Sequence, residues 1–282
     1  MQNPGVTMLS RFAILPVFSL LGLVAACGNP DVPIIPIGAA QTVDLAVSLS
    51  LDEPQVIGVT IDPVTGQRFV LDAEQGLFAV MDDGTSSLVR SQEDLPTPDV
   101  PPISEWTDFV ALGDNQFAVT ARSDGYLLDL VADTLLEHFC YEPGFMDPSF
   151  EQLTNGVSFD VETDLLYAQP ATFDMNGEVA PVDQAVESAI AAYARDGGQP
   201  VAWFPIEDVD FLAGGIAVDL DGTLLLGRDD QLYRFTPEGD GQLDLIGTLE
   251  GVGRVDGLTV DPATGELHII DGDSARLIRV RL

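Results

Sequence analysis

The sequence predicts an all-β protein of the β-propeller class with five four-stranded blades, and three observations support this prediction. A strand–turn–strand pattern recurs along the chain in similar form. Its copies lie 42 to 59 residues apart, which suits one four-stranded blade each. A further strand-like segment near the start of the folded part has no blade of its own and can complete the last one.

The repeat is clearest in residues 57–80 and 256–280. In each, a short apolar strand ends in Asp, the turn Asp-Pro-x-Thr-Gly follows, and a second apolar strand leads through a loop to a third. Proline pre-sets the φ angle of the turn, and glycine takes the left-handed position that a bulged hairpin needs. Residues 214–235 form a third copy without the proline. These turns and alternating strands indicate blades rather than helices.

Two weaker copies, which begin near Asp108 and Asn155, bring the number of units to five. The anchors of the five units are Gly58, Asp108, Gly156, Gly215 and Gly257. The longest interval contains residues 181–195, whose apolar residues recur at helical spacing, so we predict a short inserted helix there. Six blades of about 40 residues each are the alternative, but they need a further anchor that the sequence does not show.

Ring closure follows from the two ends of the repeat region. The last unit stops after its third strand, at Leu282, whereas residues 43–51 form a strand that precedes the first unit. We therefore predict that residues 43–51 complete the final blade and close the ring. The propeller domain then spans residues 43–282.

The N-terminus has the pattern of an export signal. Arg11 is the only charged residue before Asp31, and the apolar run that follows it is too short to span a bilayer comfortably. The run ends Leu-Val-Ala-Ala-Cys at Cys27, which resembles the lipobox of bacterial lipoproteins. This resemblance implies that residues 1–26 are a signal peptide and that Cys27 is acylated as the first mature residue.

Residues 27–42 are predicted to be a lipid-anchored, flexible tether, extended where its prolines lie. Gly28 stands where the resemblance would need Asp for inner-membrane retention, so we expect the outer membrane or the cell surface. With Cys27 acylated, Cys140 has no partner for a disulfide. We expect a buried, inert thiol at Cys140, and a reactive thiol beside His138 is the alternative.

The chain is strongly acidic, with 46 Asp and Glu against 11 basic residues and a formal net charge of −35. Nucleic acid is excluded as a partner because binding it needs a positive surface that releases counterions. The acidity has two interpretations, surface solubility in a saline habitat or cation capture in one region. Acidic residues are spread over the whole chain, which favours the first. We expect a monomer that contacts the membrane through its lipid anchor only.

The cadence Gly-Leu/Ile-x-Val/Ile-Asp-Pro-x-Thr-Gly resembles that of propellers with NHL-type and gluconolactonase-like repeats. The resemblance covers much of the mature chain in degenerate form and implies propeller architecture. Most members of that group are expected to have six blades, so five is a departure. The gluconolactonase-like relatives hold a divalent ion at one mouth of the channel through acidic and Asn ligands.

Loops before the first strand of a unit and loops between its second and third strands line the same mouth of a propeller channel. Both sets are rich in acidic residues here, and oxygen ligands suit calcium better than zinc. Calcium is the one cofactor that this pattern suggests. The candidate metal ligands are Glu53, Asp72, Asp108, Asn155, Asp210, Asp229, Asp256 and Asp271.

The sequence contains no zinc-protease motif, no Cys-x-x-Cys, no phosphate loop and no complete nucleophile elbow. Only His138 and His268 could serve a Ser-His-Asp triad. We therefore expect a non-catalytic propeller at the cell envelope that presents its acidic mouth to a protein or small-molecule ligand. The alternative is a calcium-dependent hydrolase or lactonase of the gluconolactonase-like kind with its site at the same mouth.

Overall fold

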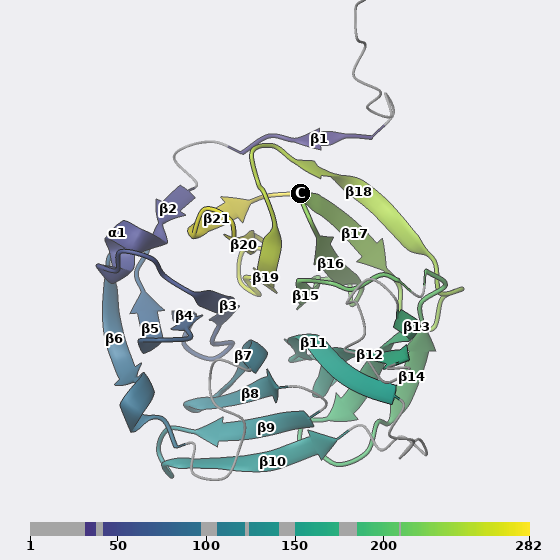
Figure 1. Ribbon diagram of the computed structural model, residues 1–282, viewed down its shortest axis with the longest axis horizontal. Coiled ribbons are helices and arrows are strands. Elements are labelled where there is room, and N and C mark those ends of the chain that lie inside the picture. Colours follow the sequence, from purple (N-terminus) through teal and green to yellow (C-terminus); the bar gives the residue numbers. More distant parts are fainter. Residues whose placement is uncertain are drawn as a thin grey trace, which may run out of the picture. The chain divides into compact units, whose positions relative to one another are not determined.

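The computed structural model describes residues 32–37, 42–96, 106–121, 124–140, 150–174, 185–208 and 210–282. Its strands form five sheets, one of five strands and four of four. Each sheet is a blade, and the five blades surround a common axis in a ring (Figure 1). The described residues form one α-helix, α1 (Leu45–Leu49), and a short 3-10 helix at Gln92–Asp94. The predicted five-bladed propeller is confirmed.

The strands follow the order of the sequence. Blade 1 consists of β3 (Val56–Ile61), β4 (Arg68–Asp72), β5 (Gly76–Val80) and β6 (Ser86–Ser91). Blade 2 consists of β7 (Trp106–Gly113), β8 (Gln116–Ala121), β9 (Asp124–Asp129) and β10 (Thr134–Cys140). Blade 3 consists of β11 (Phe150–Asp160), β12 (Leu165–Asp174), β13 (Ala185–Ala194) and β14 (Ala202–Pro205). Blade 4 consists of β15 (Gly215–Val218), β16 (Leu224–Arg228), β17 (Gln231–Phe235) and β18 (Leu243–Leu249). Blade 5 consists of β19 (Val255–Val260), β20 (Leu267–Asp271), β21 (Arg276–Val280) and β2 (Thr42–Asp44).

The first strand of each blade lies innermost, and neighbouring inner strands contact one another all the way round, including β19 with β3 (Figure 1). We call the side of the ring where these strands begin the start face and the side where they end the end face. Because successive strands are antiparallel, the loops between blades lie on the start face. The hairpins between first and second strands lie on the end face.

The repeated turn acts as the sequence predicts. In blade 1 the carboxylate of Asp62 accepts hydrogen bonds from the main-chain N–H groups of Val64 and Thr65, at 2.9 and 2.8 Å. Gly66 then adopts a φ of 71°, which a side chain would make unfavourable. In blade 5, Asp261 and Gly265 occupy the same places, with Gly265 at a φ of 68°. The turn chemistry thus sets each hairpin locally.

The ring is closed by pairing of the two ends, as predicted, but over fewer residues. β2 pairs antiparallel with β21, with Val43 opposite Leu277. The strand ends at Asp44, whose carboxylate caps α1 by accepting a hydrogen bond from Val47 N at 3.2 Å. Leu45 and Leu49 are buried in an apolar cluster that blades 1 and 5 share. In a helix, side chains four residues apart lie on the same side, so the helical conformation of residues 45–49 directs both leucines into the seam between the first and last blades.

The predicted helix at residues 181–195 is wrong. Residues 185–194 form β13, the third strand of blade 3, and residues 181–184 lie outside the described part of the chain. The run from Ser188 to Tyr193 is buried at every position. A strand covered on both faces shows no alternation of polar and apolar residues, so its pattern resembles that of a buried helix.

Part of the predicted tether belongs to the folded unit. β1 (Ile34–Ile35) adds a parallel fifth strand to blade 4, beside β18. Thr248 N donates to Pro33 O at 2.8 Å, and a β-carbon on Gly247 would lie 2.7 Å from the same oxygen. The compact unit therefore begins at Val32 rather than at Val43.

The signal peptide and Cys27 lie outside the described residues, so their roles stay predictions. Residues 38–41, the rest of the predicted tether, also lie outside them. In the part of the chain that the structure covers, no helix is long and apolar enough to cross a membrane.

The core consists of five apolar clusters, one at each interface between neighbouring blades. Between blades 1 and 2, for example, the ring of Phe69 packs edge-on against that of Phe117 with centroids 5.2 Å apart. Each blade is thus buried on both faces by its neighbours. The ring holds together by blade-to-blade packing, and the loops of both faces remain available for ligands.

Candidate functional site

A cavity of about 530 Å³, which we call the start cavity, opens on the start face. All five blades contribute residues to its lining. Trp106, Val56 and Ile57 form apolar parts of its wall. The polar side chains that line it are Gln55, Thr107, Asn155, Arg254 and Asp256.

The repeated glycines explain how closely the inner strands converge in this region. A β-carbon on Gly215 would lie 2.6 Å from the main-chain N of Leu258. One on Gly257 would lie 2.9 Å from the α-carbon of Gly58. Both distances are shorter than a β-carbon tolerates, so only glycine allows the backbones of neighbouring blades to approach in this way. The anchors found in the sequence are therefore points of contact between inner strands.

Asp108 occupies the corresponding place in blade 2, and it is 1% exposed. Its Oδ1 accepts a hydrogen bond from the main-chain N of Phe109 at 2.8 Å, and its Oδ2 accepts one from Val157 N at 3.0 Å. A β-carbon on Gly58 would lie 2.4 Å from Oδ1. Burial raises the pKa of this carboxyl well above its usual range. Asp108 thus connects inner strands and is not available to a ligand in the start cavity.

Two other predicted metal ligands, Asp72 and Asp271, are buried and organise loops. Asp72 accepts hydrogen bonds from the main-chain N–H groups of Gln55, at 2.7 Å, and of Gln75, at 2.9 Å. Asp271 accepts hydrogen bonds from the guanidinium of Arg276 at 2.5 Å and from the hydroxyl of Ser274. These bonds fix the loops between the second and third strands of blades 1 and 5, and the bond from Gln55 joins the first of them to the loop before β3. Both carboxylates therefore hold the loops of the start face in place and are not free to bind a ligand.

Four of the predicted residues do come together. A cavity of about 290 Å³ on the same face is lined by Asn155, Asp210, Asp229 and Asp256. Asn155 and Asp256 line the start cavity as well. Glu53 lies in the loop before β3, is exposed, and is not part of either lining.

The arginines at this mouth are not among the site residues predicted from the sequence. The guanidinium of Arg254 donates two parallel hydrogen bonds of 2.6 Å to the carboxylate of Asp256, and these bonds raise the pKa of the guanidinium. Arg228 lies 3.7 Å from Asp208 and stacks over the ring of Phe211 at 5.5 Å. The available signal was the closeness of Arg254 and Asp256 in the sequence, because opposite charges two residues apart can pair.

This mouth does not match the site that the family resemblance implies. Within the described ranges, no three His, Cys, Asp or Glu side chains gather in a way that could hold a metal ion. Asp256 is already neutralised by Arg254, and Asp72, Asp108 and Asp271 bind main-chain and side-chain donors instead. The residues therefore do not fit a divalent ion held by several carboxylates.

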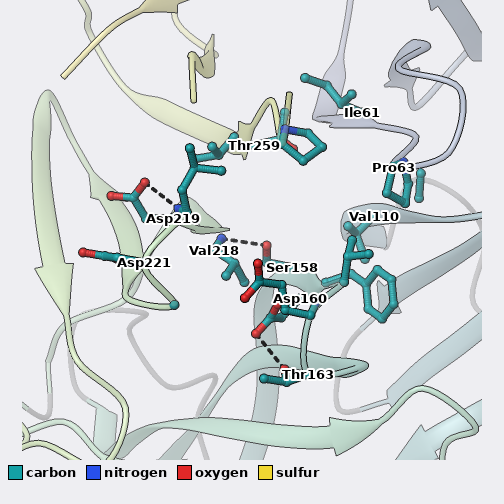
Figure 2. A pocket seen from close by; sticks show the side chains of 18 residues that line it. Ile61, Pro63, Val110, Ser158, Asp160, Thr163, Val218, Asp219, Asp221 and Thr259 are labelled. Atoms are coloured by element: carbon teal, nitrogen blue, oxygen red, sulfur yellow. Dashed lines mark hydrogen bonds between the residues drawn. The ribbon is translucent and has the colours of Figure 1, made fainter. Parts of the chain in front are cut away.

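A second large cavity, of about 380 Å³, lies on the end face, and we call it the end cavity. Figure 2 shows Asp219 and Asp221 across the cavity from Pro63 and Val110. Its carboxylates belong to hairpin turns, such as Asp160, which accepts a hydrogen bond from the Thr163 hydroxyl at 2.6 Å. The sequence does not reveal this cavity, because nothing local shows that turns of different blades surround it.

Neither described histidine is placed as a catalytic base. His268 is buried at the seam between blades 5 and 1, where Arg68 Nε donates to its Nδ1 at 2.9 Å. Burial, with Arg68 as a second cause, lowers the pKa of His268 to about 3. His138 Nε2 lies 2.6 Å from the main-chain oxygen of Arg195, in blade 3. Both rings stabilise contacts between blades, and the expectations for Cys140 stay predictions.

Comparison with known proteins extends to the fold. No protein-family model matches the sequence, and no curated protein matches it either. A calcium-binding protein, regucalcin, from Agrobacterium tumefaciens has a TM-score of 0.51 at 11% identity, covering 88% of this chain and 95% of that one. A gluconolactonase from Xanthomonas campestris has a TM-score of 0.49 at 16% identity, covering 80% and 72%. A glutaminyl cyclase from Myxococcus xanthus has a TM-score of 0.49 at 11% identity, covering 88% and 97%. The chain is a five-bladed β-propeller, and gluconolactonase-like and regucalcin-like propellers are among its structural neighbours.

Proposed function

We propose that the protein takes a small, neutral, hydroxylated molecule into the start cavity. The observation that carries this proposal is the cavity itself, whose volume of about 530 Å³ lies within the range of small-molecule sites. The amides of Gln55 and Asn155 and the hydroxyl of Thr107 line it beside an apolar wall. Such groups both donate and accept hydrogen bonds, so they suit a ligand with hydroxyl and carbonyl groups.

The fixed charges of the cavity favour a neutral ligand. Arg254 and Asp256 are the charged side chains of its lining, and they bind each other in a bidentate pair. An anionic ligand would have to compete with Asp256 for the guanidinium in a chain of net charge −35. A sugar or a sugar lactone carries no charge, and its hydroxyl groups can accept hydrogen bonds from Arg254 and donate them to Asp256.

Hydrolysis of a lactone is the second candidate function, and Asp256 favours it. Its carboxylate is partly exposed, and it lines the cavity together with the amide of Asn155. Asp256 would accept a proton from a water molecule whose oxygen attacks the lactone carbonyl, while an amide or guanidinium N–H stabilises the carbonyl oxygen. The proton would then pass to the ring oxygen as the C–O bond breaks.

The location of the protein is part of this proposal. Acylation at Cys27 would hold the propeller at the cell envelope, because several acyl chains bind a bilayer effectively permanently.

Binding can be tested by isothermal titration with glucono-δ-lactone, glucose and gluconate. We expect heat from the two neutral compounds, weaker binding of gluconate, and loss of binding in Asn155→Leu. Gln116→Leu makes the same kind of change on the end face and should bind like the wild type. Preference for gluconate, or unchanged binding in Asn155→Leu, would contradict the proposal.

Hydrolysis is tested separately, by acid release from glucono-δ-lactone in a pH-stat above the spontaneous rate. Asp256→Asn should abolish the enzymatic rate if Asp256 is the base. Asp273→Asn is the matched control, because Asp273 lies 3.9 Å from Arg254 and is not part of the lining. If the protein binds glucono-δ-lactone but does not hydrolyse it faster than the spontaneous rate, it is a binding protein and the lactonase hypothesis is excluded.

A further inference from the structure

The end cavity combines an apolar floor with an acidic rim. Its floor is formed where the inner strands end, by Ile61 of blade 1, Val110 of blade 2 and Val218 of blade 4. Ile61 and Val110 are buried beneath it. A floor built from several blades is held rigidly, because each inner strand is fixed on both sides by its neighbours.

Four carboxylates surround this floor, from Asp160 and Glu162 of blade 3 and Asp219 and Asp221 of blade 4. No Lys, Arg or His is part of the lining as the structure describes it. The nearest described counter-charge is Arg234, 3.6 Å from Asp219. Hydrogen bonds from the Thr223 side chain and main chain lower the pKa of Asp221, so this group stays ionised at neutral pH.

The turns that carry these carboxylates also expose large apolar side chains at their tips. Val161 is 54% exposed and Leu220 is 59% exposed, and both line the cavity. Val64, in the corresponding turn of blade 1, is 71% exposed and follows Pro63 of the lining. Hairpin tips are ordinarily polar, and apolar residues grouped around one hollow mark an interaction site.

We propose that the end cavity docks a partner protein through a segment that inserts a lysine or arginine side chain flanked by apolar residues. The aliphatic stem of such a side chain packs on the floor, and its charged head reaches the carboxylates of the rim. The flanking residues cover Val161 and Leu220. Figure 2 shows Asp219 and Asp221 on one side of the cavity, with Pro63 of the lining and Val110 of the floor on the other side.

Charge complementarity selects this occupant over others. An acidic or neutral polar segment would leave the carboxylates that have no ion pair within the described part of the chain, such as that of Glu162, uncompensated once water is excluded, which costs free energy. Nucleic acid and anionic lipid are repelled by the same groups. The start cavity differs, because Arg254 pairs with the carboxylate there. The two faces of the ring thus offer different chemistry, and the docking site does not depend on the small-molecule site.

The test uses the purified full chain and fluorescent peptides of alternating Leu and Lys, alternating Ser and Lys, and alternating Leu and Glu. We expect fluorescence anisotropy to show binding of the Leu–Lys peptide only. Leu220→Ser should weaken it about five- to tenfold, as removal of a partly buried leucine does. Glu162→Gln should weaken it about two- to fivefold at low salt and less at high salt, because salt screens exposed charges.

Matched controls come from β10, on the outer edge of blade 2. Leu136 has the same 59% exposure as Leu220, and Glu137 is exposed like Glu162, so Leu136→Ser and Glu137→Gln should bind the peptide like the wild type. Equal weakening by Leu220→Ser and Leu136→Ser would overturn the proposal. Equal binding of the Ser–Lys peptide would also overturn it, since it would show general attraction to an acidic protein. Asn155→Leu, on the start face, should leave peptide binding unchanged.

Discussion

The carboxylate of Asp108 accepts the main-chain N–H of Val157 at 3.0 Å and so joins the inner strands of blades 2 and 3. At the corresponding place the inner strands of blades 1, 4 and 5 carry Gly58, Gly215 and Gly257. A buried carboxyl therefore stands where a glycine stands in three other blades. Burial makes ionisation of this carboxyl unfavourable, and it also shields the hydrogen bond to Val157 from water.

Asp108→Asn tests this relationship through pH. Burial raises the pKa of Asp108 above its unfolded value, so the folded state binds the proton more tightly. The stability from this group is present at low pH and is lost as pH rises from about 4 through the raised pKa. Asn does not titrate, but its NH₂ would face a main-chain N–H. We expect the variant to be less stable than the wild type at pH 4 and the difference to shrink by pH 8, in urea unfolding. A difference that does not change with pH would contradict this account.

His268→Gln tests the seam between blades 5 and 1. The folded-state pKa of about 3 lies below the ordinary value of 6.5, so the unfolded state binds the proton more tightly. The stability from neutral His268 is present above pH 6.5 and is lost as pH falls towards 3. Gln can still accept from Arg68 but does not titrate, so the wild type should lose more stability than the variant between pH 6.5 and 4. His138→Gln, at the contact of blades 2 and 3, is the control. Parallel curves of unfolding free energy against pH for the wild type and His268→Gln would contradict this expectation.

Leu45→Ala tests ring closure. Leu45 is fully buried in α1 against residues of blades 1 and 5. Its truncation should lower the free energy of unfolding by about 2–5 kcal/mol in one cooperative transition, because each blade packs on both neighbours. Val47→Ala in the same helix changes a side chain that is 75% exposed and should cost little. Urea unfolding followed by circular dichroism measures both. Similar losses would show that α1 does not hold the seam.

Calcium addition tests the metal site. Three of the carboxylates that the sequence offered, Asp72, Asp108 and Asp271, are bonded elsewhere, and Asp256 is paired with Arg254. We therefore expect millimolar calcium to raise the melting temperature no more than sodium chloride of matched ionic strength, which screens the net charge of −35. Differential scanning fluorimetry with both salts and with magnesium measures this. A rise specific to calcium that disappears in Asp256→Asn would restore the metal site.

Cys27→Ser tests the proposed anchoring. Without acylation, a cleaved signal leaves nothing to hold the mature chain on a bilayer, so the variant should move from the membrane to the soluble fraction. Fractionation after carbonate washing, together with labelling by radioactive palmitate, measures the change. Cys140→Ser keeps Cys27 and should remain in the membrane fraction with its label. Wild-type protein that takes up no label would show that the lipobox reading is wrong.

Local chemistry made much of the fold predictable. Asp-Pro-x-Thr-Gly forms a turn through hydrogen bonds among neighbouring residues, such as those that the Asp62 carboxylate accepts from the N–H groups of Val64 and Thr65. Each copy of this motif therefore predicts a hairpin. The glycine anchors and their spacing likewise indicate blades, because inner strands can meet closely only at glycine. The unpaired strand at one end and the missing strand at the other predicted the closure of the ring.

Contacts between distant residues decided the rest. β13 reads like a helix because both of its faces are covered, and α1 forms because Leu45 and Leu49 fill a seam between blades that are distant in sequence. Asp72, Asp108 and Asp256 look alike along the chain, each an acid in an inner or second strand. Only the folded ring brings the first two to main-chain N–H groups distant in sequence, those of Gln55 and Val157. It also places the third in the lining of a cavity, paired with Arg254. The sequence by itself determined the repeat and the ring, since both arise from local turn and strand chemistry. Tertiary structure decided which carboxylates a ligand can reach, because burial and pairing depend on neighbours brought together by folding.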